Sequence, residues 1–95
     1  MSMTLDAYRA KLVIIILYAE SADAIERYIE TAAQALKSRK INSYVSARFI
    51  AKLSNQFEVI TRSATEHQMN NIKVAKNCLE KLTAGRSNNF PININ

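Results

Sequence analysis

The sequence predicts an all-α protein, a small four-helix bundle whose helices run up, down, up and down. Gly and Pro each occur once in the 95 residues, both near the C-terminus, so the chain lacks the tight turns that hairpins and Greek keys require. Apolar residues recur at helical spacings of three and four in four successive segments with short connections. Three long helices, or an orthogonal helical packing, are the alternatives that this pattern leaves open.

The first helix is expected over about 5–19 and contains the most apolar stretch of the chain. Residues 12–19 read Leu-Val-Ile-Ile-Ile-Leu-Tyr-Ala without a polar interruption. This run would also suit a buried strand, but a helical stripe extends it back to the N-terminus, where Thr4 is the expected N-cap. The stripe comprises Leu5, Tyr8, Leu12, Ile15 and Ala19. Eight residues rise only about 12 Å as a helix, so the run is too short to span a membrane.

The second helix is expected over 22–38, after a connection of two or three residues that implies an antiparallel pairing with the first. Ser21 or Asp23 can cap its N-terminus, and Lys37 places a cation at the negative end of the helix dipole. Its core stripe comprises Ala22, Ile25, Ile29, Ala32 and Leu36.

The third helix is expected over 43–61, with Asn42 or Ser43 as its N-cap. Asn55 could cap a fresh helix within this range, but the apolar stripe continues through it, so a single helix is predicted. That stripe comprises Val45, Phe49, Leu53, Phe57 and Ile60.

The fourth helix is expected over 64–84, because Ser63 and Glu66 have the spacing of a capping box and Gly85 suits the C′ position. Its stripe comprises Ile72, Ala75, Leu79 and Leu82, with Met69 upstream. Residues 1–85 are thus predicted to form one helical domain, followed by a flexible tail over 86–95.

Positive charge is concentrated in the second part of the chain. The net charge is +5, but residues 1–36 hold three Lys or Arg against five Asp or Glu, whereas residues 37–95 hold ten against three. This asymmetry indicates an anionic partner for the second part, or two chains that pack acidic against basic regions, or simply a solvated basic face. The candidate contacts are Lys37, Arg39, Lys40, Tyr44, Arg48 and Lys52.

Part of this basic segment resembles a helix-turn-helix. Ala35, Val45 and Ser46 fall where that motif has its packing Ala, its buried Val and a polar neighbour. Arg39, however, stands where the motif has its turn Gly, and Arg48 occupies a position that is usually apolar. A nucleic-acid-binding regulator is therefore one alternative function.

Arg62 and His67 form the most plausible catalytic pair. The string Arg-Ser-Ala-Thr-Glu-His resembles the Arg-x4–6-His motif of the HEPN-type ribonucleases, which are small helical dimers. The resemblance implies a metal-independent ribonuclease in which His67 moves a proton and Arg62 stabilises the phosphorane. The alternative interpretation is a helix start that carries an exposed His.

No cofactor or metal is expected. Phosphate-binding loops need several glycines, and a tetrahedral zinc site would need two ligands beyond His67 and Cys78. A single Cys excludes an internal disulfide and suits a reducing compartment, and the N-terminus lacks the basic region of a secretory signal. A cytoplasmic location is expected.

The leading expectation is a small interaction or regulatory protein, such as an adaptor, a chaperone-like protein or an immunity protein, that binds a macromolecular partner and has no catalytic activity. A bundle helix buries an apolar arc of roughly 100°, yet residues 12–19 are apolar on every side. Once other residues of the run fill the core, Val13, Ile14 and Leu17 are left over. They predict a homodimer, or a complex with another protein, along the first helix.

Overall fold

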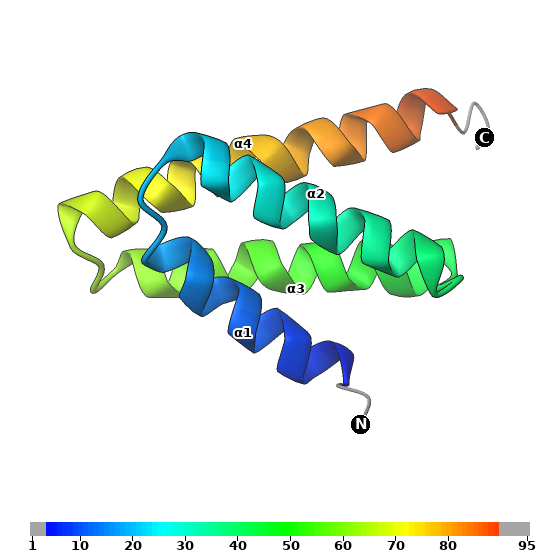
Figure 1. The fold of residues 1–95 in the computed structure, drawn as a ribbon, viewed down its shortest axis with the longest axis horizontal. Helices are drawn as coiled ribbons and strands as arrows, with labels where there is room; N and C mark the ends of the chain where they lie inside the picture. The colour runs from blue at the N-terminus through cyan, green and yellow to red at the C-terminus, as the bar shows by residue number, and fades with distance from the viewer. Residues whose placement is uncertain (1–3, 90–95) are drawn as a thin grey trace.

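The computed structural model describes residues 4–89, and within them it contains four α-helices and no strands. These are α1 (Leu5–Leu17), α2 (Ala22–Ser38), α3 (Ser43–Thr61) and α4 (Glu66–Asn89). Figure 1 shows the chain reversing direction at each connection, so the helices run up, down, up and down. The predicted all-α four-helix bundle is confirmed, and α3 is continuous through Asn55. None of the described helices is both long enough and apolar enough to span a membrane.

Helix α4 is the central element, because it packs against each of the other three. Helix α2 packs mainly on α4, α1 packs on α3 and α4 and less extensively on α2, and the contact between α2 and α3 is slight. In a helix-turn-helix the two helices pack on each other. The packing of α2 and α3 therefore differs from that motif, although a short turn connects them.

The core combines apolar side chains from all four helices. It comprises Leu12, Val13, Ile16, Ala19, Ile25, Ile29, Ala32, Leu36, Phe49, Leu53, Phe57, Ile72, Ala75 and Leu79. The stripes predicted for the second, third and fourth helices supply ten of these residues, and only Ala22 of the second stripe is exposed. Helical periodicity therefore located the core faces of α2, α3 and α4 correctly.

The predicted core face of α1 is correct at Leu5, Tyr8, Leu12 and Ala19, which lie in the core or pack against it, and wrong at Ile15. Val13, expected at a partner interface, is 3% exposed, whereas Ile15, expected in the core, is 37% exposed. Consecutive helical residues are rotated by about 100°, and in an unbroken apolar run nothing marks which neighbour faces inward. The helix also ends at Leu17 instead of residue 19, and the chain then turns so that Ala19 is buried.

Side chains cap the helix starts, mostly as predicted. The side-chain oxygens of Thr4, Ser21 and Asn42 accept hydrogen bonds from the backbone N–H three residues later, at 3.1, 3.1 and 2.9 Å. The capping box expected at Ser63 is instead formed by Thr65 and Gln68. Thr65 Oγ1 accepts from the Gln68 N–H at 3.1 Å, and Gln68 Oε1 accepts from the Thr65 N–H at 3.0 Å.

Helix α4 continues past Gly85 to Asn89, so the predicted end at residue 84 is wrong. No glycine in the described range has a positive φ, and a glycine inside a helix costs only about 1 kcal/mol relative to alanine. The first four residues of the predicted tail therefore belong to α4, and residues 90–95 lie outside the described range.

Helix α2 ends in a Schellman motif with a lysine in the left-handed position. Lys40 has φ of 58° and donates its N–H to the Lys37 carbonyl at 3.0 Å, and the Ile41 N–H reaches the Leu36 carbonyl at 3.0 Å. The turn residue expected from the helix-turn-helix pattern was Arg39, which lies one position earlier as the C-cap of α2.

Candidate functional site

The side chains of Asn71 and His67 on α4 bind the C-terminal end of α1. Asn71 is 6% exposed, and its Nδ2 donates to the carbonyl oxygens of Ile16, Leu17 and Ala19 at 3.0, 3.1 and 3.1 Å. His67 Nε2 lies 3.0 Å from the Ala19 carbonyl oxygen. The last carbonyls of a helix lack i→i+4 partners, so these two side chains supply donors to the end of α1, where the backbone itself adds one bond from the Ala19 N–H to the Ile16 carbonyl at 3.1 Å.

This arrangement bears on the predicted pair of Arg62 and His67. A carbonyl oxygen only accepts hydrogen bonds, so His67 Nε2 carries the proton in its contact with Ala19. Arg62 is the exposed C-cap of α3, and its charge acts on Glu58. Within one copy of the chain, Arg62 and His67 therefore have different neighbours: Arg62 acts on Glu58, and His67 contacts the Ala19 carbonyl.

Sequence reasoning missed Asn71. The available signal was its spacing, because Asn71 lies four residues after His67 and therefore on the same face of the helix. The next residue, Ile72, belongs to the predicted core stripe. Because consecutive helical residues are rotated by about 100°, the Asn71 side chain lies beside the core face.

The outer side of α1 exposes three large side chains. Ile14 is 57% exposed, Ile15 is 37% exposed and Tyr18 is 71% exposed. Of the three predicted interface residues, only Ile14 is exposed, since Val13 is buried and Leu17 is half-buried against the core. We call Ile14, Ile15 and Tyr18 the α1 apolar patch.

The predicted basic residues lie at the turn before α3 and along one face of that helix. Lys37, Arg39 and Lys40 are exposed around the C-terminal end of α2. Tyr44, Arg48 and Lys52 follow at four-residue intervals on α3 and line one hollow together.

This hollow, which we call the basic hollow, lies between α1 and α3 and has a volume of about 280 Å³. Tyr44, at its edge, is 69% exposed, and the Arg48 guanidinium carbon lies 5.8 Å from the centre of its ring. Arg9 and Asp6 of α1 contribute to the same wall. The sequence prediction did not include Arg9, because α1 and α3 are brought together only by the fold.

Arg9 is held in place by two partners. Its Nη1 donates to Asp6 Oδ1 at 2.8 Å, and its Nε donates to Gln56 Oε1 at 3.2 Å. The hydrogen bond and charge of Arg9, together with the charge of Lys52, lower the pKa of the Asp6 carboxyl. Asp6 therefore remains ionised near neutral pH and offsets one of the positive charges that line the basic hollow.

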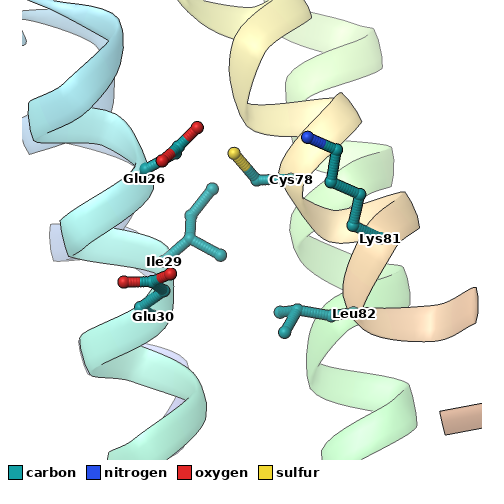
Figure 2. A pocket seen from close by; sticks show the side chains of 6 residues that line it. All are labelled: Glu26, Ile29, Glu30, Cys78, Lys81 and Leu82. Carbon is teal, nitrogen blue, oxygen red and sulfur yellow. The ribbon is translucent and has the colours of Figure 1, made fainter. Parts of the chain in front are cut away.

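A second hollow of about 250 Å³ lies between α2 and α4, where Cys78 and Lys81 face Glu26 and Glu30 (Figure 2). Burial, followed by the negative charge of Glu26, raises the pKa of the Cys78 thiol. The residues that the structure describes contain no group of three or more His, Cys, Asp or Glu placed to hold a metal ion. The thiol in this hollow is therefore less ionised than a free cysteine at neutral pH, and the described residues around it form no metal-ligand group.

Comparison with protein-family models, curated proteins and solved structures finds no match for this chain. Its function is therefore argued from its own geometry and charge.

Proposed function

We propose that this protein is a small helical binding protein of the adaptor or regulator type, that it catalyses no reaction, and that it self-associates through the α1 apolar patch. The observation that carries the proposal is the joint exposure of Ile14, Ile15 and Tyr18 on one side of a helix. Positions 14 and 18, and positions 15 and 18, are neighbours on a helix surface, so the three side chains form one continuous patch. Such patches mark contact surfaces more often than isolated exposed residues do.

The charges that flank the patch favour a second copy of the chain as the partner. Lys11 lies one helical turn before Ile15, and Glu20 lies two residues after Tyr18, and both side chains are exposed. In a two-fold dimer with antiparallel α1 helices, the Lys11 end of one copy faces the Glu20 end of the other. Two symmetric ion pairs would then border an apolar centre, which is the usual anatomy of a protein interface.

The size of the patch sets the expected affinity. Specific interfaces typically bury about 800 Å² per partner, and three partly exposed side chains supply only part of that area. We therefore expect a weak dimer, with a dissociation constant of about 10–100 µM. The single thiol, Cys78, is half-buried and unpaired by any disulfide, which suits the cytoplasm as the compartment.

Sedimentation velocity over a concentration series tests the proposal. The wild-type chain is expected to shift from monomer to dimer as its concentration rises through the expected dissociation constant. Ile14→Asp places a charge at the centre of the patch and is expected to weaken the dimer at least about thirtyfold. Because Ile14 is exposed, the melting temperature of the Ile14→Asp variant, followed by circular dichroism, should differ little from that of the wild type.

Charge reversal at the two ends tests the antiparallel arrangement. Lys11→Glu and Glu20→Lys each create like-charge contacts in a homodimer and are expected to weaken it about tenfold. An equimolar mixture of these two variants can form a heterodimer with both ion pairs restored, and it should sediment like the wild type. A wild-type chain that stays monomeric at millimolar concentration, or an Ile14→Asp variant that dimerises normally, would refute the proposal.

A further inference from the structure

Beyond self-association, we propose that the basic hollow between α1 and α3 binds single-stranded nucleic acid. In this arrangement a base stacks on Tyr44, and the adjoining backbone phosphates contact Arg48 and Lys52. The three side chains come from one face of α3, and α1 supplies the opposite wall through Arg9.

The charge of this region is almost entirely positive. No Asp or Glu occurs from residue 31 to residue 57, a stretch that covers the second half of α2, the turn and most of α3. Among the side chains that line the basic hollow, Asp6 is the one carboxylate, and Arg9 pairs with it. The positive charges of Arg48 and Lys52 are therefore available to an anion.

The spacing of the cations suits an extended phosphate backbone. Arg48 and Lys52 are one helical turn apart, which is about 6 Å along the axis of α3. Lys37, Arg39 and Lys40 extend the positive surface beyond the N-terminus of α3. A strand that follows α3 would meet cations at successive phosphates, which is how sequence-tolerant binding sites are built.

The exposed ring of Tyr44 favours a nucleic acid over an acidic protein. Most of the large apolar side chains described are at least half-buried, whereas Tyr44 is 69% exposed and has Arg48 above its ring. An aromatic face beside cations offers stacking to an unpaired base, and the bases of a duplex have no free face to offer. A polycarboxylate could use the cations but would gain nothing from the ring.

Fluorescence anisotropy with a labelled 12-nucleotide poly-dT probe tests the inference, with a hairpin duplex and a poly-glutamate peptide of matched charge as the comparison ligands. The single strand is expected to bind several-fold more tightly than either. Its affinity should fall steeply with salt, because each phosphate that a cation neutralises makes the slope of log K against log salt steeper by about 0.7 for single strands.

Matched variants separate the site from the overall charge. Arg48→Ala and Lys81→Ala each remove one positive charge. Lys81, however, lies in the second hollow, between α2 and α4, far along the chain from the basic hollow and beside Glu26 and Glu30. Arg48→Ala is expected to weaken binding about five- to tenfold and to reduce the salt slope by about 0.7, whereas Lys81→Ala should stay within about twofold of wild type. Tyr44→Phe keeps the stacking face and should bind normally, whereas Tyr44→Ala should lose about tenfold.

Three results would overturn the inference. They are equal weakening by the Arg48 and Lys81 substitutions, equal affinity for poly-glutamate or duplex, and no binding at 50 mM salt with 100 µM protein. The basic hollow lies along the first half of α1, and the α1 apolar patch lies along its second half. The monomeric Ile14→Asp variant should therefore still bind the probe, so the failure of one proposal can be distinguished from the failure of the other.

Discussion

Replacing Asn71 by alanine should destabilise the bundle far more than an ordinary surface substitution. The Asn71 amide donates to three backbone carbonyls at the end of α1, those of Ile16, Leu17 and Ala19. The Ile16 carbonyl also accepts from the Ala19 N–H at 3.1 Å, and the Ala19 carbonyl also contacts His67 Nε2 at 3.0 Å. An alanine side chain donates no hydrogen bond. The substitution therefore removes the side-chain donor of all three carbonyls, and the Leu17 carbonyl loses the most, because Ile16 keeps the Ala19 N–H and Ala19 keeps His67.

The magnitude follows from the geometry. Asn71 Nδ2 carries two protons, so the three contacts of 3.0–3.1 Å amount to about two full hydrogen bonds. Each such bond contributes roughly 1 kcal/mol, and a buried acceptor left unpaired costs up to about 1–3 kcal/mol. Alanine returns a few tenths of a kcal/mol through helix propensity. We expect a net loss of about 2–3 kcal/mol, or about 10–20 °C in Tm for a domain of this size.

Urea unfolding followed by circular dichroism at 222 nm measures this loss, and Asn70→Ala is the matched control. Asn70 is the same residue type at the adjacent position of α4, but it is exposed, so its substitution should change stability by less than about 0.5 kcal/mol. Asn71→Asp should be at least as damaging as alanine at pH 7, because a carboxylate would face carbonyl oxygens. If Asn71→Ala and Asn70→Ala differ by less than 1 kcal/mol, the assigned role of Asn71 is wrong.

Two further predictions concern the end of α2 and the single thiol. Lys40→Gly should raise the free energy of unfolding, measured in urea, by about 0.5–1 kcal/mol, because Lys40 has a positive φ that glycine adopts without strain. Arg39→Gly should lower it, because Arg39 has an ordinary φ of −84°. Equal effects of the two substitutions would contradict the assigned role of the positive φ. Because the pKa of Cys78 is raised, its alkylation by iodoacetamide at pH 7.5 should be slower than that of free cysteine. Glu26→Gln should accelerate the reaction and Glu66→Gln should not, so an equal rate in both variants would exclude the Glu26 charge as a cause.

The fold of α2, α3 and α4 could be predicted from the sequence because their apolar residues are separated by polar ones. Ile25 and Ile29 on α2, or Phe49 and Leu53 on α3, stand among residues that prefer water, so only one helical face can be buried. The caps Ser21 and Asn42 could be recognised for a similar reason, since their side chains act on backbone groups three residues away.

The orientation of α1 could not be predicted in the same way. Val13 and Ile15 are both β-branched aliphatic residues in an unbroken apolar run, and they differ in the structure only by the side of the helix on which they lie. The choice between them depends on where α3 and α4 contact α1. The sequence predicted that Val13, Ile14 and Leu17 would be exposed on α1. The exposed large apolar residues are instead Ile14, Ile15 and Tyr18, the α1 apolar patch.

The sequence by itself determined the helical class, the four helices to within a few residues and the concentration of positive charge after residue 36. These properties are local, because they depend on spacing, capping and composition along a few turns of chain. The tertiary structure decided which side of α1 is exposed, how Arg9 joins Arg48 in the basic hollow, and how Asn71 pairs with the end of α1. Each of these depends on contacts between residues about 40 to 55 positions apart, which only the packing of the helices brings together.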